Sequence, residues 1–200
     1  MKADFYDRDP RRVAVDLLGC VLTHRSREGV VSGVIVETEA YLPEDPACHA
    51  YNGPTMRNRT MFEGPGLAYV YLSYGIHHLL NVVCEGKGVG SAVLIRALHP
   101  LEGEALMARR RGGYSGLCNG PGKLTRALGV GLEKDGHDLT GGDLTISRGE
   151  PPEAEIVATT RVGITRGAHL PWRYLVLGDA NVSVVPKRLE ERGLRNSLWD

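Results

Sequence analysis

The chain has 200 residues, 42% of them apolar, so it can bury the core of one domain and is too short for more than two small ones. Its formal charge is zero and its pI is near neutral, which argues against a protein that binds nucleic acid through bulk positive charge. No apolar run approaches the ~20 residues of a membrane-spanning helix, and the first residues do not form a signal peptide. We therefore expect a cytoplasmic protein with no membrane partner.

A short helix and a β-hairpin are expected in the first part of the chain. Asp9 and Pro10 have the pattern of an N-cap and a first helical residue, and apolar residues follow at helical spacing. Residues 20–26 and 30–41 are rich in strand-forming residues and flank a turn at Glu28 and Gly29, which predicts a hairpin. Prolines and glycines in residues 43–66 indicate a loop.

Strands outnumber helices in the remainder. Further strands are predicted over residues 67–74, 77–85, 91–98, 143–148, 155–165 and 173–177. Helices are predicted over residues 101–111 and 120–129. Short turns between neighbouring strands favour an α+β fold, in which one compact domain over residues 1–200 has a curved, mostly antiparallel sheet and flanking helices.

Charge is distributed unevenly along the chain. Residues 105–132 contain five basic residues and no acidic one, whereas residues 133–155 contain seven acidic residues and two basic ones. This split could create one basic face on a neutral protein, or it could reflect two solvated loops.

The four cysteines form no CxxC pair, which argues against a structural zinc site and against a disulfide framework.

The segment VIVETEAY, residues 34–41, places two carboxylates in a predicted strand. Side chains alternate along a strand, so Glu37, Glu39 and Tyr41 share one face. A solvent-exposed face of an antiparallel sheet would explain the glutamates without any function.

The segment LAYVYLSYGIHHLLN, residues 67–81, contains three tyrosines and an asparagine that could also form part of a site. Tyr69 and Tyr71 share a strand face, and Tyr74 comes just before the turn, where its ring either packs on a neighbour or projects as a wedge. Asn81 stands among apolar residues and needs a hydrogen-bond partner from the protein or from a ligand. Each residue alone has an ordinary structural explanation, but with VIVETEAY they describe a pocket.

Two further motifs are weaker. CNGPGKLT differs from a P-loop because Leu124 stands where the pattern requires Ser or Thr, so we exclude a nucleoside triphosphate site. A glycine-rich helix start with Lys123 suits a phosphate group and equally suits an ordinary helix. His49, His77 and His78 lack metal-ligand spacing, so we expect no metal and no cofactor.

The chain resembles the alkyladenine (3-methyladenine) DNA glycosylase family in VETEAYLPEDPACHAYNG, RNRTMF, YVYLSYGIHHLLNVV, AVLIRALHPLEG and LCNGPGKLTRALGV, in that order. With TTRVGIT and NVSVV, the resemblance extends from about residue 4 to residue 185. It implies a monofunctional hydrolase, acting as a monomer. The implied partner is double-stranded DNA with damaged purines, which are flipped out of the duplex and released by an activated water.

The resemblance also implies roles for individual residues. Glu39 matches the general base, and Arg96 matches an arginine near the water. Pocket residues that contact the flipped base are Tyr41, His49, Tyr71 and Asn81. Tyr74 matches the side chain that fills the gap in the duplex, and we expect backbone contacts from Arg57, Arg59 and Lys123. Glu37 receives no catalytic role.

The sequence departs from mammalian members of the family in three ways. The spacing from Tyr41 to His49 is one residue shorter, Ile76 stands in place of a methionine, and His77 in place of a tyrosine. Two alternatives stay open: a non-catalytic nucleic-acid-binding module on the same scaffold, and a metal-dependent hydrolase that uses the histidines. The preferred damaged purine is not determined by the sequence.

Overall fold

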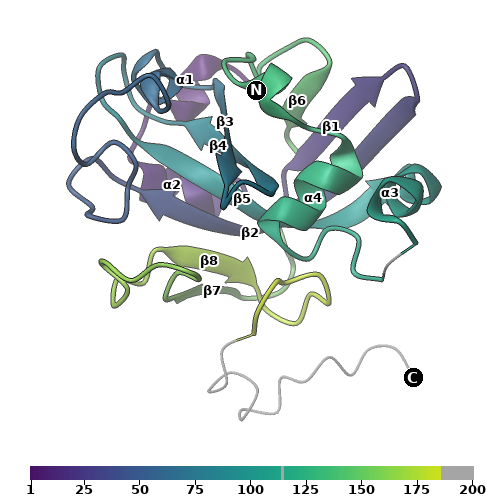
Figure 1. Cartoon of the computed structure of the whole chain (residues 1–200). Helices are drawn as coiled ribbons and strands as arrows, with labels where there is room; N and C mark the ends of the chain where they lie inside the picture. The colour runs from purple at the N-terminus through teal and green to yellow at the C-terminus, as the bar shows by residue number, and fades with distance from the viewer. Residues whose placement is uncertain (114, 186–200) are drawn as a thin grey trace.

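In the computed structural model, residues 1–113 and 115–185 are described, and they form an eight-stranded antiparallel sheet. The strands are β1 (Val21–Ser26), β2 (Gly29–Tyr41), β3 (Ala68–Ser73), β4 (His77–Val83), β5 (Ala92–Glu102), β6 (Leu144–Ser147), β7 (Ile156–Thr159) and β8 (Arg173–Val176). Their order is β3-β4-β5-β2-β1-β6, while β8 pairs with β2 and β7 pairs with β8. Figure 1 shows the sheet curling into a half-barrel, with the β7–β8 hairpin beside β2.

Within the described residues, four short helices flank the sheet: α1 (Ala3–Tyr6), α2 (Pro10–Asp16), α3 (Glu104–Arg111) and α4 (Pro121–Leu128), with 3₁₀ turns η1 (Arg59–Phe62) and η2 (Leu132–Lys134). Figure 1 shows α4 in front of the sheet and α2 behind it. The main apolar core lies between these helices and the strands and includes the fully buried Leu17, Ile35 and Ile95. The predicted α+β class with a curved antiparallel sheet is confirmed, whereas the single domain over residues 1–200 stays a prediction.

Most predicted elements form, with three differences. The strand predicted over residues 155–165 ends at Thr159, so Arg161 is presented from a loop. The helix predicted from residue 101 begins at Glu104 because β5 continues to Glu102. Gly103 separates them with a φ of 79°, and a Cβ there would lie 2.4 Å from the Val30 carbonyl oxygen, so only glycine fits. Helix α1 was not predicted.

Strand β2 is covered on both edges at residues 37–39. One edge pairs with β5, and the other pairs first with β1 and then with β8. Helix α2 packs on the face that carries Thr38, whose Oγ1 donates to the Ala14 carbonyl oxygen at 2.9 Å. On the other face Glu37 and Glu39 are both 0% exposed, so a solvent-exposed face does not explain the two glutamates.

No helix among the residues that the structure describes is long and apolar enough to cross a membrane.

Candidate active site

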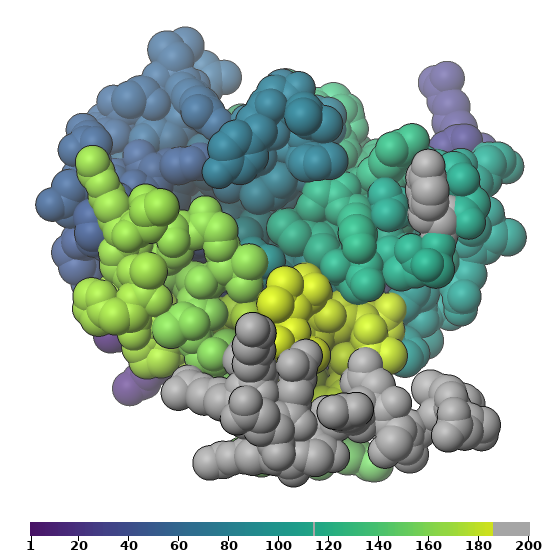
Figure 2. All heavy atoms as spheres, turned by 60° about the horizontal axis from the view of Figure 1, so that its bottom comes forward, coloured from purple at the N-terminus to yellow at the C-terminus, as the bar shows by residue number. Residues whose placement is uncertain are grey.

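A pocket of about 800 Å³ lies where the β3–β4 hairpin, the start of α4 and the segment after β7 meet. Figure 2 shows these parts of the chain around a hollow on one face of the molecule. The volume falls within the ~300–1,000 Å³ typical of small-molecule sites. The predicted site residues that line it are Tyr41, His49, Arg57, Tyr71, Tyr74, Asn81, Arg96 and Lys123. Glu39 and Arg59 are not part of the lining.

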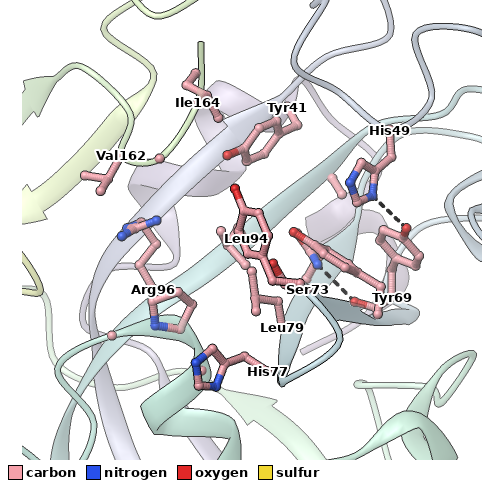
Figure 3. Close-up of a pocket in the computed structure, with 18 of the residues that line it drawn as sticks. Tyr41, His49, Tyr69, Ser73, His77, Leu79, Leu94, Arg96, Val162 and Ile164 are labelled. Atoms are coloured by element: carbon pink, nitrogen blue, oxygen red, sulfur yellow. Dashed lines mark hydrogen bonds between the residues drawn. The ribbon is translucent and has the colours of Figure 1, made fainter. Parts of the chain in front are cut away.

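Tyr71 and His49 form an aromatic wall. Strand β3 places Tyr69 and Tyr71 with ring centroids 5.4 Å apart, and the His49 ring lies 4.5 Å from Tyr71 in an edge-to-face arrangement. His49 Nδ1 and the Tyr69 hydroxyl form a 2.9 Å hydrogen bond, drawn in Figure 3. Burial, together with the nearby charge of Arg57, lowers the pKa of His49, so its imidazole is neutral at pH 7.

Asn81 is buried in β4, opposite Leu94 of β5. Its Nδ2 donates to the Tyr69 carbonyl oxygen at 3.1 Å, which prevents the amide from rotating freely. Figure 3 shows Leu79 and Leu94 as the apolar centre of the pocket. The amide is therefore a fixed polar group at the edge of an apolar cavity.

Glu39 lies behind the pocket wall. The Val162 N–H donates to its Oε1 at 2.7 Å, and the Tyr41 hydroxyl donates to its Oε2 at 2.8 Å. Arg96 Nη1 lies 3.3 Å from the same Oε2. Because these three residues all line the pocket, a single layer of groups separates the carboxylate from it. In Figure 3, Arg96 and Val162 lie on the side opposite His49 and Tyr69.

Burial, followed by the charge of Glu39, raises the pKa of Tyr41 well above its ordinary value. The phenol therefore keeps its proton and acts as a donor to the carboxylate. Burial also raises the pKa of Tyr71, to about 12, so this wall of the pocket carries no charge either.

Glu37 is the counter-ion of two buried arginines. Its Oε1 accepts hydrogen bonds from Arg96 Nε at 2.8 Å and from Arg173 Nε at 2.7 Å. Ser183 adds its backbone N–H at 2.6 Å and its hydroxyl at 2.8 Å. Burial disfavours the charge of Arg96, but the carboxylates of Glu39 and Glu37 outweigh this and raise its pKa. Glu37 thus holds Arg96 where its guanidinium faces Glu39.

The residues expected to contact DNA lie around the pocket mouth, apart from Arg59. Tyr74 is 90% exposed at the tip of the β3–β4 hairpin, beside Ile76 at 72%. Arg57 lies 5.6 Å from the Tyr71 ring centroid, and Lys123 Nζ donates to Asn119 Oδ1 at 2.8 Å. Arg59 is exposed in η1, outside the pocket lining.

Sequence reasoning missed four residues of the site: Val162, Arg173, Ser183 and Arg161. Each reaches the glutamate strand from more than 100 positions later in the chain, so no local spacing connects them to it. A strand was expected through Arg161 and Val162, which hid the loop that presents the Val162 amide to Glu39.

A largely apolar, aromatic pocket beside a buried carboxylate and a buried arginine has the features of a site that binds a flat ring. The profile of the family described as Methylpurine-DNA glycosylase (MPG) matches residues 4–180. The chain belongs to the methylpurine-DNA glycosylase family.

Relatives agree with this assignment over nearly their whole length. A protein of Rubrobacter xylanophilus is 70% identical over 93% of this chain and 97% of its own. A protein of Carboxydothermus hydrogenoformans is 50% identical over 90% and 96%, and one of Methanoculleus marisnigri is 51% identical over 92% and 98%. All three carry the name "Putative 3-methyladenine DNA glycosylase".

Proposed function

We propose that the protein is a monofunctional DNA glycosylase that removes alkylated or deaminated purines from double-stranded DNA. Family membership and the names of the relatives support a DNA glycosylase. The observation that carries the finer proposal is the aromatic pocket whose wall residues Tyr41, Arg96 and Val162 all touch Glu39.

A base inside a duplex cannot reach this pocket, so the nucleotide must first rotate out of the helix. The conformation of Tyr74 supports a role in that step. Tyr74 and Gly75 have φ angles of 49° and 70°, and Ile76 N–H donates to the Ser73 carbonyl oxygen at 3.0 Å. Such a turn normally takes Asn or Gly, and a tyrosine there costs roughly 1–3 kcal/mol. An exposed ring on a strained backbone suits a wedge that fills the gap in the base stack.

The pocket suits an electron-poor purine. The rings of Tyr41 and Tyr71 offer stacking surfaces, and a cationic alkylated base is attracted to the face of an aromatic ring. Neutral His49 adds no positive charge that would repel such a base.

Glu39 is suited to act as general base. When the N-glycosidic bond breaks, its electrons leave with the purine, and positive charge develops on the sugar. Water then attacks the sugar carbon and transfers a proton to the Glu39 carboxylate. Because Glu39 has no exposed surface, water reaches it only if Tyr41, Arg96 or Val162 shifts. Binding of the flipped nucleotide would supply that displacement.

Backbone phosphates would be bound by local positive charge around the pocket. Arg57 and Lys123 line it, and Lys123 stands in the first turn of α4 beside Gly120 and Gly122. Backbone N–H groups at a helix start favour an anion. Arg59, two residues after Arg57, is exposed and can contact a neighbouring phosphate. These contacts would give DNA binding to a protein without net charge.

The decisive experiment is base release from duplex oligonucleotides that each carry one lesion: 3-methyladenine, 7-methylguanine, hypoxanthine or ethenoadenine. We expect release of at least one of these purines, with an intact sugar–phosphate backbone. Binding to lesion DNA without release would favour the non-catalytic module.

Release should be unchanged in EDTA, since no group of three or more His, Cys, Asp or Glu side chains within residues 1–113 and 115–185 could hold a metal ion. Loss of release in EDTA would favour the metal-dependent hydrolase.

Asn81 is expected to exclude guanine. Guanine carries a 2-amino group that hypoxanthine and adenine lack, and the amide fixed on the Tyr69 carbonyl oxygen cannot move away from it. Asn81→Ser or Asn81→Ala should therefore increase release of guanine-type bases relative to hypoxanthine. Competition between the two lesions in one reaction measures the preference, and an unchanged ratio would exclude this role.

A further inference from the structure

The buried ion pair of Arg161 and Asp45 connects three parts of the site. Both side chains are 0% exposed, and the Arg161 guanidinium donates to both Asp45 carboxylate oxygens. Arg161 Nη1 also donates to the Ala40 carbonyl oxygen at 3.0 Å, directly before Tyr41. Arg161 does not line the pocket, so the pair acts on it from behind.

The first connection is to the Tyr41 ring. The Arg161 guanidinium carbon lies 4.7 Å from the Tyr41 ring centroid and 5.2 Å from that of Trp172. Its Nε is buried without a hydrogen-bond partner among the described residues, so at this atom the charge is balanced only by the neighbouring rings and Asp45. The cation therefore fixes the ring that forms one wall of the pocket.

The second connection is to Glu39. Val162 follows Arg161 directly, and its N–H donates to Glu39 Oε1 at 2.7 Å. The third connection runs through Asp45, whose Oδ1 accepts the Ala47 N–H at 3.0 Å in the turn that leads to His49. One ion pair thus fixes the Tyr41 wall, the donor to Glu39 and the start of the His49 turn.

We infer that Arg161 is a positioning residue, which sets the Tyr41 ring for stacking and the Val162 amide for hydrogen bonding to Glu39. This inference rests on the proposed function, because it concerns binding and release of the damaged base. Arg161 touches neither the base nor the water.

Two kinetic changes distinguish positioning from folding. Without Arg161, the Tyr41 wall is less ordered, so the KM for lesion DNA should rise about 10-fold or more. Without the Val162 donor, the Glu39 carboxylate is held less firmly toward the attacking water, so the single-turnover rate at saturating protein should fall as well.

The experiment compares single-turnover release across protein concentration for the wild type, Asp45→Asn/Arg161→Met and Arg161→Lys. The double variant removes both charges, which is far less destabilising than removing one, and the asparagine that replaces Asp45 can still accept the Ala47 N–H. Arg161→Lys keeps the charge opposite Asp45 but loses the planar guanidinium, so it should show both changes in smaller size.

Arg110→Met is the matched control, because Arg110 also binds a carboxylate, Glu28, and two carbonyl oxygens, but outside the pocket. It should lower stability without changing KM or the single-turnover rate at saturating protein. A wild-type KM and a wild-type rate at saturating protein in folded Arg161 variants would overturn the inference. An inactive wild type would instead overturn the proposed function.

Discussion

Glu39→Gln is expected to abolish base release, while lesion DNA should still bind nearly as tightly as it does to the wild type. Glutamine keeps the shape of the side chain but cannot accept the proton of the attacking water. General-base catalysis contributes about 10²–10⁴-fold to the rate. The single-turnover rate should therefore fall by at least about 10²-fold. The measurement is single-turnover release together with a gel-shift titration on the same oligonucleotide, and a near wild-type rate would exclude Glu39 as the base.

Glu37→Gln is the matched control, since both glutamates are fully buried on one strand. Glu37 has Arg96, Arg173 and Ser183 as partners, and its loss weakens a buried ion cluster. The main effect should be a lower free energy of unfolding, because breaking a buried pair typically costs about 3–5 kcal/mol. Release per folded molecule should fall much less than in Glu39→Gln. Equal losses of catalysis would contradict the assignment.

Tyr74→Ala is expected to reduce the fraction of flipped nucleotide and to leave the chemical step unchanged. The ring is 90% exposed and makes no contribution to the core, so its removal affects the opened duplex rather than the fold. By analogy with base stacking on aromatic rings, the loss is about 1–3 kcal/mol in the flipping equilibrium. Fluorescence from 2-aminopurine next to the lesion reports flipping directly.

Two controls make the Tyr74 prediction specific. The defect should shrink for single-stranded DNA, where little unstacking is needed. Tyr74→Asn should show the same flipping defect as Tyr74→Ala, because asparagine tolerates the φ of 49° and preserves the turn but cannot stack as a ring. A variant that flips normally but cleaves slowly would place Tyr74 in the catalytic pocket instead of at the wedge.

The local parts of the fold were accessible from the sequence. Alternation along VIVETEAY predicted that Glu37 and Glu39 share a face, and in the structure Arg96 indeed contacts both. The turn at Gly75 correctly placed Tyr74 at a hairpin tip. Such features follow from short-range geometry, which a few neighbouring residues determine.

The environment of the site was not accessible in the same way. Whether Glu37 faces water depends on β8 and on the segment with Ser183, whose positions follow from the tertiary fold. The strand predicted through residue 165 was also wrong, because alternating apolar residues near Val162 resemble a strand although that segment forms a loop. Roles of Glu39, Asn81 and the other site residues stay predictions until the variants are measured.

The partners of Glu37 in β2 come from the C-terminal part of the chain, and this has a consequence for how the protein acquires activity. Glu37 is synthesised early, but its partners Arg173 and Ser183 follow 136 and 146 positions later. Pairing over such separations carries a large loop-closure cost and slows folding. The buried carboxylates must therefore wait for the C-terminal part of the chain, so a nascent chain should become competent for catalysis only in the last stage of folding.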